Sequence, residues 1–206
     1  MALTVHHTYP KNNTILTLWR ATESTEELFV LAKLSAADLL IFDKIHLDKR
    51  RREWLCVKIL LSQFAKEESL RNLSNGKPMI SGGRHISVSH DGEIAGVIFS
   101  DQNIGMDIQT PHEKLLRIAP KFCSEIELSF VKSHIHELEA LTMIWSAKEA
   151  VFKFFGERVH FAKDMRTVPF ELSDEKLYVE YNGIHGSKTF ELSHLILNDF
   201  HILHTN

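Results

Sequence analysis

Two short segments, GMDIQ and WSAKEAVFK, combine residue types that could bind a divalent cation and a phosphate. Asp107 alternates with apolar neighbours as in a strand, so Asp107 and Gln109 are expected on one strand face. Glu149 and Lys153 are four residues apart, which places both on one face of a helix. Magnesium in proteins prefers one or two carboxylates, several waters and substrate phosphates. Asp107 and Glu149 would supply that minimum.

Each segment taken alone also has a simpler interpretation, which is the favoured one in isolation. Glu149 and Lys153 can form a surface ion pair that stabilises a helix by only about 0.2–0.5 kcal/mol. Asp107 and Gln109 can be the solvated side of a sheet. The hypothesis of a metal site therefore depends on other groups in the chain that suit phosphate.

Such groups occur in the first half of the chain. Ser89 and His90 stand at the end of the expected strand HISVSH, where hydroxyls, backbone N–H groups and an imidazole can bind phosphate. Lys77 follows a glycine in an expected turn, and Arg52 ends the basic run Lys49–Arg52. Charge runs are usually solvated helix. A Ser-His hydrolase dyad is not expected, because no GxSxG is present and adjacent Ser and His cannot readily pair.

Composition limits the class of protein and its setting. The chain has 206 residues, 44% of them hydrophobic and 25% charged, which is typical of one large or two small globular domains. A net charge of −3 argues against a general nucleic-acid binder. Cys56 and Cys123 form no CxxC pair, and neither a signal peptide nor an apolar run of about 18 residues occurs. We expect a cytoplasmic protein without membrane segments or structural zinc.

Periodicity predicts the same order of elements in both halves. In the first half we expect a strand over 14–19, helices over 24–64, a turn over 74–78, and the hairpin HISVSH–IAGVIFS around Asp91-Gly92. In the second we expect the strand NIGMDIQ, helix from Glu113, and a helix over 138–155 that ends at Gly156. Strands in TVPFEL, KLYVEYN and SKTFELSHLILNDFHILH follow.

This order predicts an α+β fold built as a pseudo-dimer of two similar subdomains, each a small antiparallel sheet packed with helices. The expected division is 1–102 for the first half and 103–206 for the second.

Five blocks in this order, RRREWLCVK, NGKP, SVSH, GMDIQ and WSAKEAVFK, resemble those of the surfactin-type 4′-phosphopantetheinyl transferases. The last block is similar to the branch of that family with Trp and Lys-Glu-Ala. The blocks cover about half of the chain, from Arg50 to Lys153. WSAKEAVFK downstream of SVSH and GMDIQ is the specific part, whereas GxD or GKP alone means little.

The resemblance implies an enzyme with holo-acyl-carrier-protein synthase activity. It would move the phosphopantetheine arm of coenzyme A to a serine of an apo acyl or peptidyl carrier protein and release adenosine 3′,5′-bisphosphate. Asp107 and Glu149 would bind Mg²⁺, Lys153 would offset pyrophosphate charge, and Glu149 would be the base. The adenosine phosphates would be held by Arg52, Lys77, Ser89 and His90, and the helical segment after Gln109 would face the carrier.

The chain departs from the family pattern at two informative positions. Many members have a carboxylate where Gln109 stands, so Gln109 is expected to be a weak or water-mediated ligand. Lys58 replaces a common arginine, which keeps the charge but loses the bidentate fork.

Three other hypotheses stay open at this point. The fold could have lost its activity, could serve one unusual carrier, or could be a non-catalytic adaptor that binds an acidic partner through Lys49–Arg52. The adaptor predicts no role for Asp107. A monomer is expected, since an internal pseudo-dimer already joins both halves, and the carrier (fatty acid, polyketide or peptide synthesis) is left undetermined.

Overall fold

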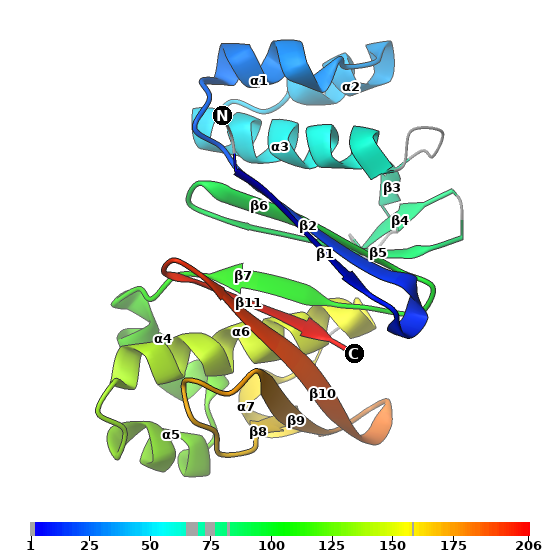
Figure 1. Ribbon diagram of the computed structural model, residues 1–206. Helices are drawn as coiled ribbons and strands as arrows, with labels where there is room; N and C mark the ends of the chain where they lie inside the picture. Colours follow the sequence, from blue (N-terminus) through cyan, green and yellow to red (C-terminus); the bar gives the residue numbers. More distant parts are fainter. Residues whose placement is uncertain (1–2, 65–69, 73–76, 82, 158) are drawn as a thin grey trace. The chain divides into compact units, whose positions relative to one another are not determined.

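The computed structural model describes residues 3–64, 70–72, 77–81, 83–157 and 159–206 (Figure 1). Contacts divide the chain into two compact units. The first comprises Met1–Leu73 and Pro78–Asn103, and the second comprises Ser74–Lys77 and Ile104–Asn206. Among the described residues, no helix has the length and apolar character needed to span a membrane.

The first unit is built on an antiparallel sheet with the strand order β1-β2-β6-β5-β4-β3 over the described residues. Its strands are β1 (Leu3–Tyr9), β2 (Thr14–Arg20), β3 (Leu70–Asn72), β4 (Pro78–Ile80), β5 (His85–Asp91) and β6 (Ile94–Ser100). A short 3₁₀ turn, η1 (Lys11–Asn13), joins β1 to β2. The strands β5 and β6 form the expected hairpin, in which Asp91 pairs with Ile94.

Helix α3 (Asp48–Phe64) covers one face of this sheet, and α1 (Thr25–Ala32) and α2 (Ala36–Phe42) lie on the outer side of α3 (Figure 1). The long helix α3 packs against β2 and β6, and α1 packs on α3 (Figure 1). Leu55 and Leu60 of α3 are fully buried in one core with Val97 of β6. Burial of these apolar side chains is the main force that holds the helix on the sheet.

The second unit repeats this plan with a sheet in the order β7-β11-β10-β9-β8 over the described residues. The strands are β7 (Met106–Gln109), β8 (Met165–Thr167), β9 (Lys176–Gly183), β10 (Gly186–Leu197) and β11 (Phe200–Thr205), and the helices are α4 (Lys114–Phe122), α5 (Glu125–Lys132), α6 (Glu137–Phe155) and α7 (Phe161–Asp164). Helix α6 packs on β7 and β11 and is buried nearly all round.

The two units share one topology. When the edge strand β1 is set aside, each begins with a strand, continues with helices, and ends with four strands whose last member pairs with the first. The α+β class with an antiparallel sheet and helices in each unit is therefore confirmed.

Local signals explain where several helices begin and end. Helices α1, α2 and α5 each start at a capping box, in which a serine accepts the N–H of the third helical residue and that residue's carboxylate accepts the serine N–H. Helix α6 ends at Gly156, whose φ of 68° is the left-handed conformation that glycine adopts at least cost, as the sequence predicted.

Some sequence expectations were wrong in detail. A strand was expected over TVPFEL, but the strand found there, β8, ends at Thr167, the first residue of that segment. It does not continue because Pro169 cannot donate a ladder hydrogen bond. Strand β1 was missed, since its alternation is carried by His and Thr rather than by strongly apolar residues. The turn expected over 74–78 lies largely outside the described residues.

Candidate active site

The close approach of β7 to α6 brings the candidate metal ligands together within the second unit. Gly105 comes directly before β7, and a Cβ built there would lie 1.9 Å from the Ala150 carbonyl oxygen and 2.5 Å from the Phe154 nitrogen. Only glycine can occupy this position without moving backbone. The glycine of GMDIQ is therefore what allows the strand bearing Asp107 to lie against the helix bearing Glu149.

Lys153 of α6 forms an ion pair with Asp107 on the strand β7, outside its own helix. Its Nζ donates to Asp107 Oδ1 at 2.8 Å, and Asp107 is 6% exposed. A buried carboxylate is stable as an ion only when it is paired or bound to a metal. The interpretation of Glu149 and Lys153 as an ordinary surface ion pair thus does not fit, because the partner of Lys153 is a buried carboxylate on another element.

Glu149 has an altered acidity. Burial raises its pKa to about 7, the negative charge of Asp107 adds to the rise, and Lys153 opposes it. Two carboxylates that repel each other beside one lysine form a donor set that suits a hard divalent cation, which would relieve the repulsion. A carboxyl group that titrates near neutral pH also suits proton transfer.

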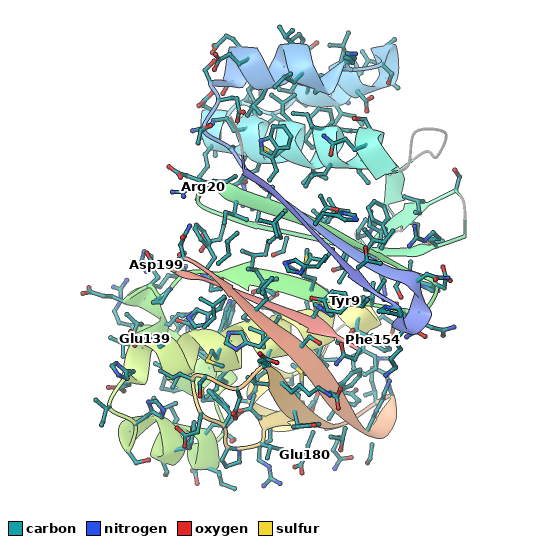
Figure 2. All side chains as sticks on the ribbon, viewed as in Figure 1. Tyr9, Arg20, Glu139, Phe154, Glu180 and Asp199 are labelled. Carbon is teal, nitrogen blue, oxygen red and sulfur yellow. The ribbon has the colours of Figure 1, made fainter. Side chains whose placement is uncertain are left out.

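Gln109 lies on the strand that carries Asp107, and Lys77 contacts the end of the helix that carries Glu149. Gln109 lies on the same face of β7 as Asp107, and its amide nitrogen donates a long 3.5 Å hydrogen bond to the Thr110 carbonyl. Lys77 Nζ donates at 2.6 Å to the carbonyl of Phe154. Phe154, which is labelled in Figure 2, lies in the last turn of α6. Burial lowers the pKa of Lys77. Lys77 is therefore placed at the helix end that carries Lys153.

The other candidates, Arg52, Ser89 and His90, lie in the first unit and do not form one group. Arg52 Nη2 donates to the backbone carbonyls of Ala21 at 3.1 Å and Glu23 at 3.0 Å. Ser89 is 5% exposed and faces away from His90, since successive strand residues alternate. His90 lies beside α3, next to Arg50 rather than Arg52.

A pocket of about 130 Å³ opens beside these residues within the first unit. Four charged residues of α3 line it together with Glu93 and the backbone turn at Gly92: Asp48, Lys49, Arg52 and Glu53. The pocket thus combines two basic side chains and three carboxylates with the end of the β5–β6 hairpin. Of the residues that the sequence predicted to hold phosphate, Arg52 lines it.

Comparison with known proteins finds a family similarity in the second unit. Residues 103–203 match the model of the 4′-phosphopantetheinyl transferase superfamily. The match includes β7 and α6 and hence Asp107, Glu149 and Lys153. A relative is enterobactin synthase component D of Salmonella typhimurium, 29% identical over 118 residues. The aligned part is 54% of this chain and 50% of the relative, so the chain spans about half the length of the curated relative that it matches.

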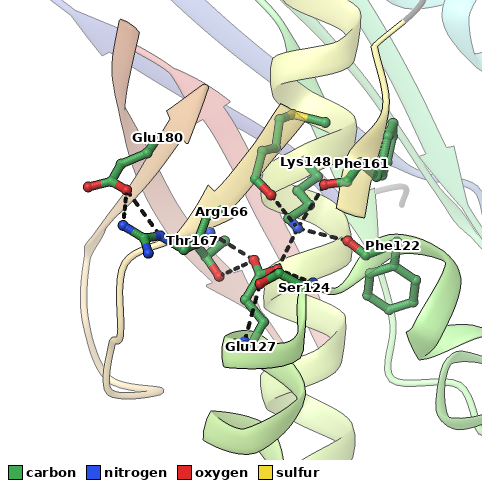
Figure 3. Close-up of polar contacts among 9 residues, drawn as sticks. Phe122, Ser124, Glu127, Lys148, Phe161, Arg166, Thr167 and Glu180 are labelled. Carbon is green, nitrogen blue, oxygen red and sulfur yellow. Dashed lines mark hydrogen bonds and ion pairs between the residues drawn. The ribbon is translucent and has the colours of Figure 1, made fainter. Parts of the chain in front are cut away.

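The region that matches the superfamily model, residues 103–203, contains a buried ion pair that the sequence did not predict. Lys148, next to Glu149, is fully buried, and its Nζ donates at 2.7 Å to Glu127 Oε2 (Figure 3). The same ammonium lies 2.7 Å from the Phe122 carbonyl, 3.0 Å from the Phe161 carbonyl and 2.9 Å from the Met165 carbonyl. Lys148 therefore connects α6 to the end of α4 and to the starts of α7 and β8.

Glu127 completes this network from the start of α5. Its Oε1 accepts the backbone N–H and the hydroxyl of Thr167, both at 2.8 Å, and its Oε2 accepts from Ser124 (Figure 3). Burial opposes ionisation, but Lys148 and these N–H groups hold the pKa of Glu127 below its ordinary value. In WSAKEAVFK, Lys148 is structural, and the adjacent Glu149 faces the candidate site. The capping box Ser124-x-x-Glu127 was the available signal.

A buried pair of histidines in the second unit, His194 and His201, predicts that stability depends on pH. His194 Nδ1 contacts the Asp174 carbonyl at 2.8 Å, and its Nε2 lies 3.1 Å from His201 Nδ1. Burial lowers the pKa of His201 to about 4, His194 adds to this, and Glu139, which is labelled in Figure 2, opposes it.

Between the ordinary histidine pKa of about 6.5 and a pH near 4, the unfolded chain binds a proton that folded His201 does not. Stability is therefore complete above about pH 6.5 and falls as pH decreases. We expect a loss of ~2 kcal/mol at pH 5, measured by urea denaturation. His201→Gln should reduce this slope, and an unchanged slope would contradict the assignment.

Proposed function

We propose that the protein transfers the 4′-phosphopantetheine arm of coenzyme A to a serine of an apo acyl or peptidyl carrier protein. The observation that carries this proposal is the grouping of Asp107, Glu149 and Lys153 by β7 and α6 within the region that matches the transferase superfamily. The name of the relative from Salmonella typhimurium, enterobactin synthase component D, supports a synthase as the setting.

In the proposed reaction the carrier serine oxygen attacks the β-phosphorus of coenzyme A. The bond from that phosphorus to the bridging oxygen breaks, and adenosine 3′,5′-bisphosphate leaves. Glu149 receives the serine proton, directly or through a water. Its pKa of about 7 suits this step, because a base works best when its pKa lies near the working pH.

Asp107 and Glu149 would hold Mg²⁺, with Gln109 as a weaker ligand or as a partner of a bound water. The ion, when bound, supplies charge neutralisation at the pyrophosphate. Lys153 holds Asp107 in place and offers positive charge to the pyrophosphate. Lys77, fixed at the end of α6, adds a second ammonium for the phosphates.

The adaptor hypothesis fits the first unit less well. Arg51 Nε donates to the Ile45 carbonyl at 2.6 Å, and Arg52 donates to two other backbone carbonyls. These two arginines of the basic run are engaged within their own unit. An acidic partner would meet mainly Lys49 and Arg50.

The proposal is tested by incubating the protein with coenzyme A, Mg²⁺ and a panel of apo carriers from fatty acid, polyketide and peptide synthesis. Intact-mass spectrometry should show the phosphopantetheine increment on at least one carrier. No increment on any carrier, together with no binding of coenzyme A, would contradict it. We further propose that the enzyme acts as a monomer in the cytoplasm, which gel filtration and fractionation would check.

Gln109→Glu tests the proposed metal site. The added carboxylate should be tolerated and should tighten Mg²⁺ binding about 10-fold, since hard cations favour charged oxygen ligands. The Mg²⁺ concentration for half-maximal transfer measures this. A large loss of transfer would show that the amide has a role that a carboxylate cannot fill.

A further inference from the structure

Ser146, in the segment WSAKEAVFK, is a buried residue of α6 to which the proposed function gives no role. Its exposed fraction is 0%, and its hydroxyl has no hydrogen-bond partner among the described residues. A buried hydroxyl without a partner has given up its hydrogen bonds to water and gained none in return. Such groups are rare in folded proteins, and each one calls for an explanation.

A serine inside a helix usually faces solvent or donates to the carbonyl four residues earlier. Thr142, one turn before Ser146 and equally buried, makes the second choice, because its Oγ1 donates to the Leu138 carbonyl at 2.7 Å. Ser146 makes neither choice. Its hydroxyl is therefore not used by the backbone of α6.

The position of Ser146 on α6 places it next to the candidate metal ligand of that helix. Ser146 stands three residues before Glu149 and seven before Lys153, so all three lie on one helix face. This is the face from which Lys153 reaches Asp107 of β7. Lys148 extends to another side of the helix, where it binds Glu127.

The direction of helical side chains brings the carboxylate of Glu149 over the hydroxyl. Side chains on a helix lean toward its N-terminus, so Glu149 extends over the turn that contains Ser146. The Cβ atoms of residues three apart are about 5–6 Å from each other. A serine hydroxyl and a glutamate carboxylate can bridge that separation with one hydrogen bond.

A carboxylate that binds a cation through one oxygen still has acceptor sites on the other oxygen. Hydrogen-bond donors behind such carboxylates fix their orientation, and their loss typically weakens metal binding by about 10–100-fold. The Ser146 hydroxyl is a donor of this kind, one helical turn from Glu149 and committed to no other described group.

We propose that Ser146 is a positioning residue whose hydroxyl donates to the carboxylate of Glu149 and holds it toward the divalent cation. This inference rests on the proposed function, in which Asp107 and Glu149 hold Mg²⁺. The hydrogen bond belongs to the cation-bound position of Glu149. Ser146 itself contacts neither the cation nor coenzyme A.

The test is Ser146→Ala, which removes the hydroxyl and keeps a good helix former. Mn²⁺ replaces Mg²⁺ as the probe, and electron paramagnetic resonance counts the free ion during a titration of the protein. We expect the Kd for Mn²⁺ to rise ~10-fold. Thr142→Val is the matched control, because it removes an equally buried hydroxyl from the same helix, and its Kd should equal that of the wild type.

Thermal unfolding gives a second readout that does not depend on turnover. Ser146→Ala should not lower the midpoint in the absence of metal, since an unpaired buried hydroxyl does not stabilise the fold. The rise in midpoint on addition of Mn²⁺ should be smaller than in the wild type, because this rise follows the Kd. Thr142→Val should show the same Mn²⁺-dependent rise as the wild type.

An unchanged Kd for Mn²⁺ in Ser146→Ala would overturn the inference. An equal increase in Kd for Thr142→Val would also overturn it, since that result indicates a general loosening of α6. So would a lower midpoint of Ser146→Ala without metal, because the hydroxyl would then serve the helix. Wild-type protein that binds no Mn²⁺ would instead remove the metal site on which the inference rests and count against the proposed function.

Discussion

Glu149→Gln is expected to lower kcat for phosphopantetheine transfer by about 10²–10⁴-fold while the fold stays intact. The amide cannot accept the serine proton, and it binds Mg²⁺ without the charge of a carboxylate. Glu149 already titrates near neutral pH because of burial and the nearby charge of Asp107. Removing that ionisable group should not destabilise the helix.

Transfer is measured under saturating coenzyme A and carrier, with circular dichroism and thermal melting as checks on folding. Glu137→Gln, at an exposed position in the first turn of the same helix, is the matched control and should leave kcat unchanged. Near-normal turnover of Glu149→Gln would mean that another group is the base.

Lys148→Met is expected to lower the free energy of unfolding by roughly 3–5 kcal/mol, because it leaves the buried carboxylate of Glu127 without its cation. Both side chains are almost completely buried, at 0% and 2% exposed. Urea denaturation followed by tryptophan fluorescence measures the loss, and Trp145 on the same helix reports on this region.

Two comparisons separate the charge from the loss of packing. Lys148→Met combined with Glu127→Gln should be less unstable than Lys148→Met alone, since no unpaired charge remains. Lys176→Met removes an exposed ion pair with Glu191 and should hardly change the midpoint of urea denaturation. A double variant as unstable as the sum of both single changes would show that the ion pair is not the cause.

Periodicity and motif order were sufficient to predict the elements around the second unit's candidate site. The alternation in GMDIQ predicted a strand, and the apolar spacing over 138–155 predicted the helix that became α6. Ile144, Ala147 and Val151, which recur at helical spacing in the sequence, are all fully buried. Local sequence carries this information because burial follows the helical period.

Partners far apart in sequence could not be predicted, because they depend on packing. The pairing of Lys153 with Asp107 spans 46 residues and requires the close approach at Gly105. The contact of Arg50 with His90 spans 40 residues, so the sequence favoured Arg52 in the same basic run without a way to tell them apart. Lys148 and Glu149 are adjacent in sequence, but Lys148 lies in the core and Glu149 lies at the candidate site. Only the orientation of α6 decides this difference.

The central claim is tested most directly by following both products of a single turnover with wild-type protein, coenzyme A, Mg²⁺ and an apo carrier. We expect one adenosine 3′,5′-bisphosphate to be released for each carrier that gains the phosphopantetheine mass, with neither product formed after chelation of Mg²⁺. Release of the nucleotide without carrier modification, or neither product with any carrier, would contradict phosphopantetheinyl transfer as the function of this chain.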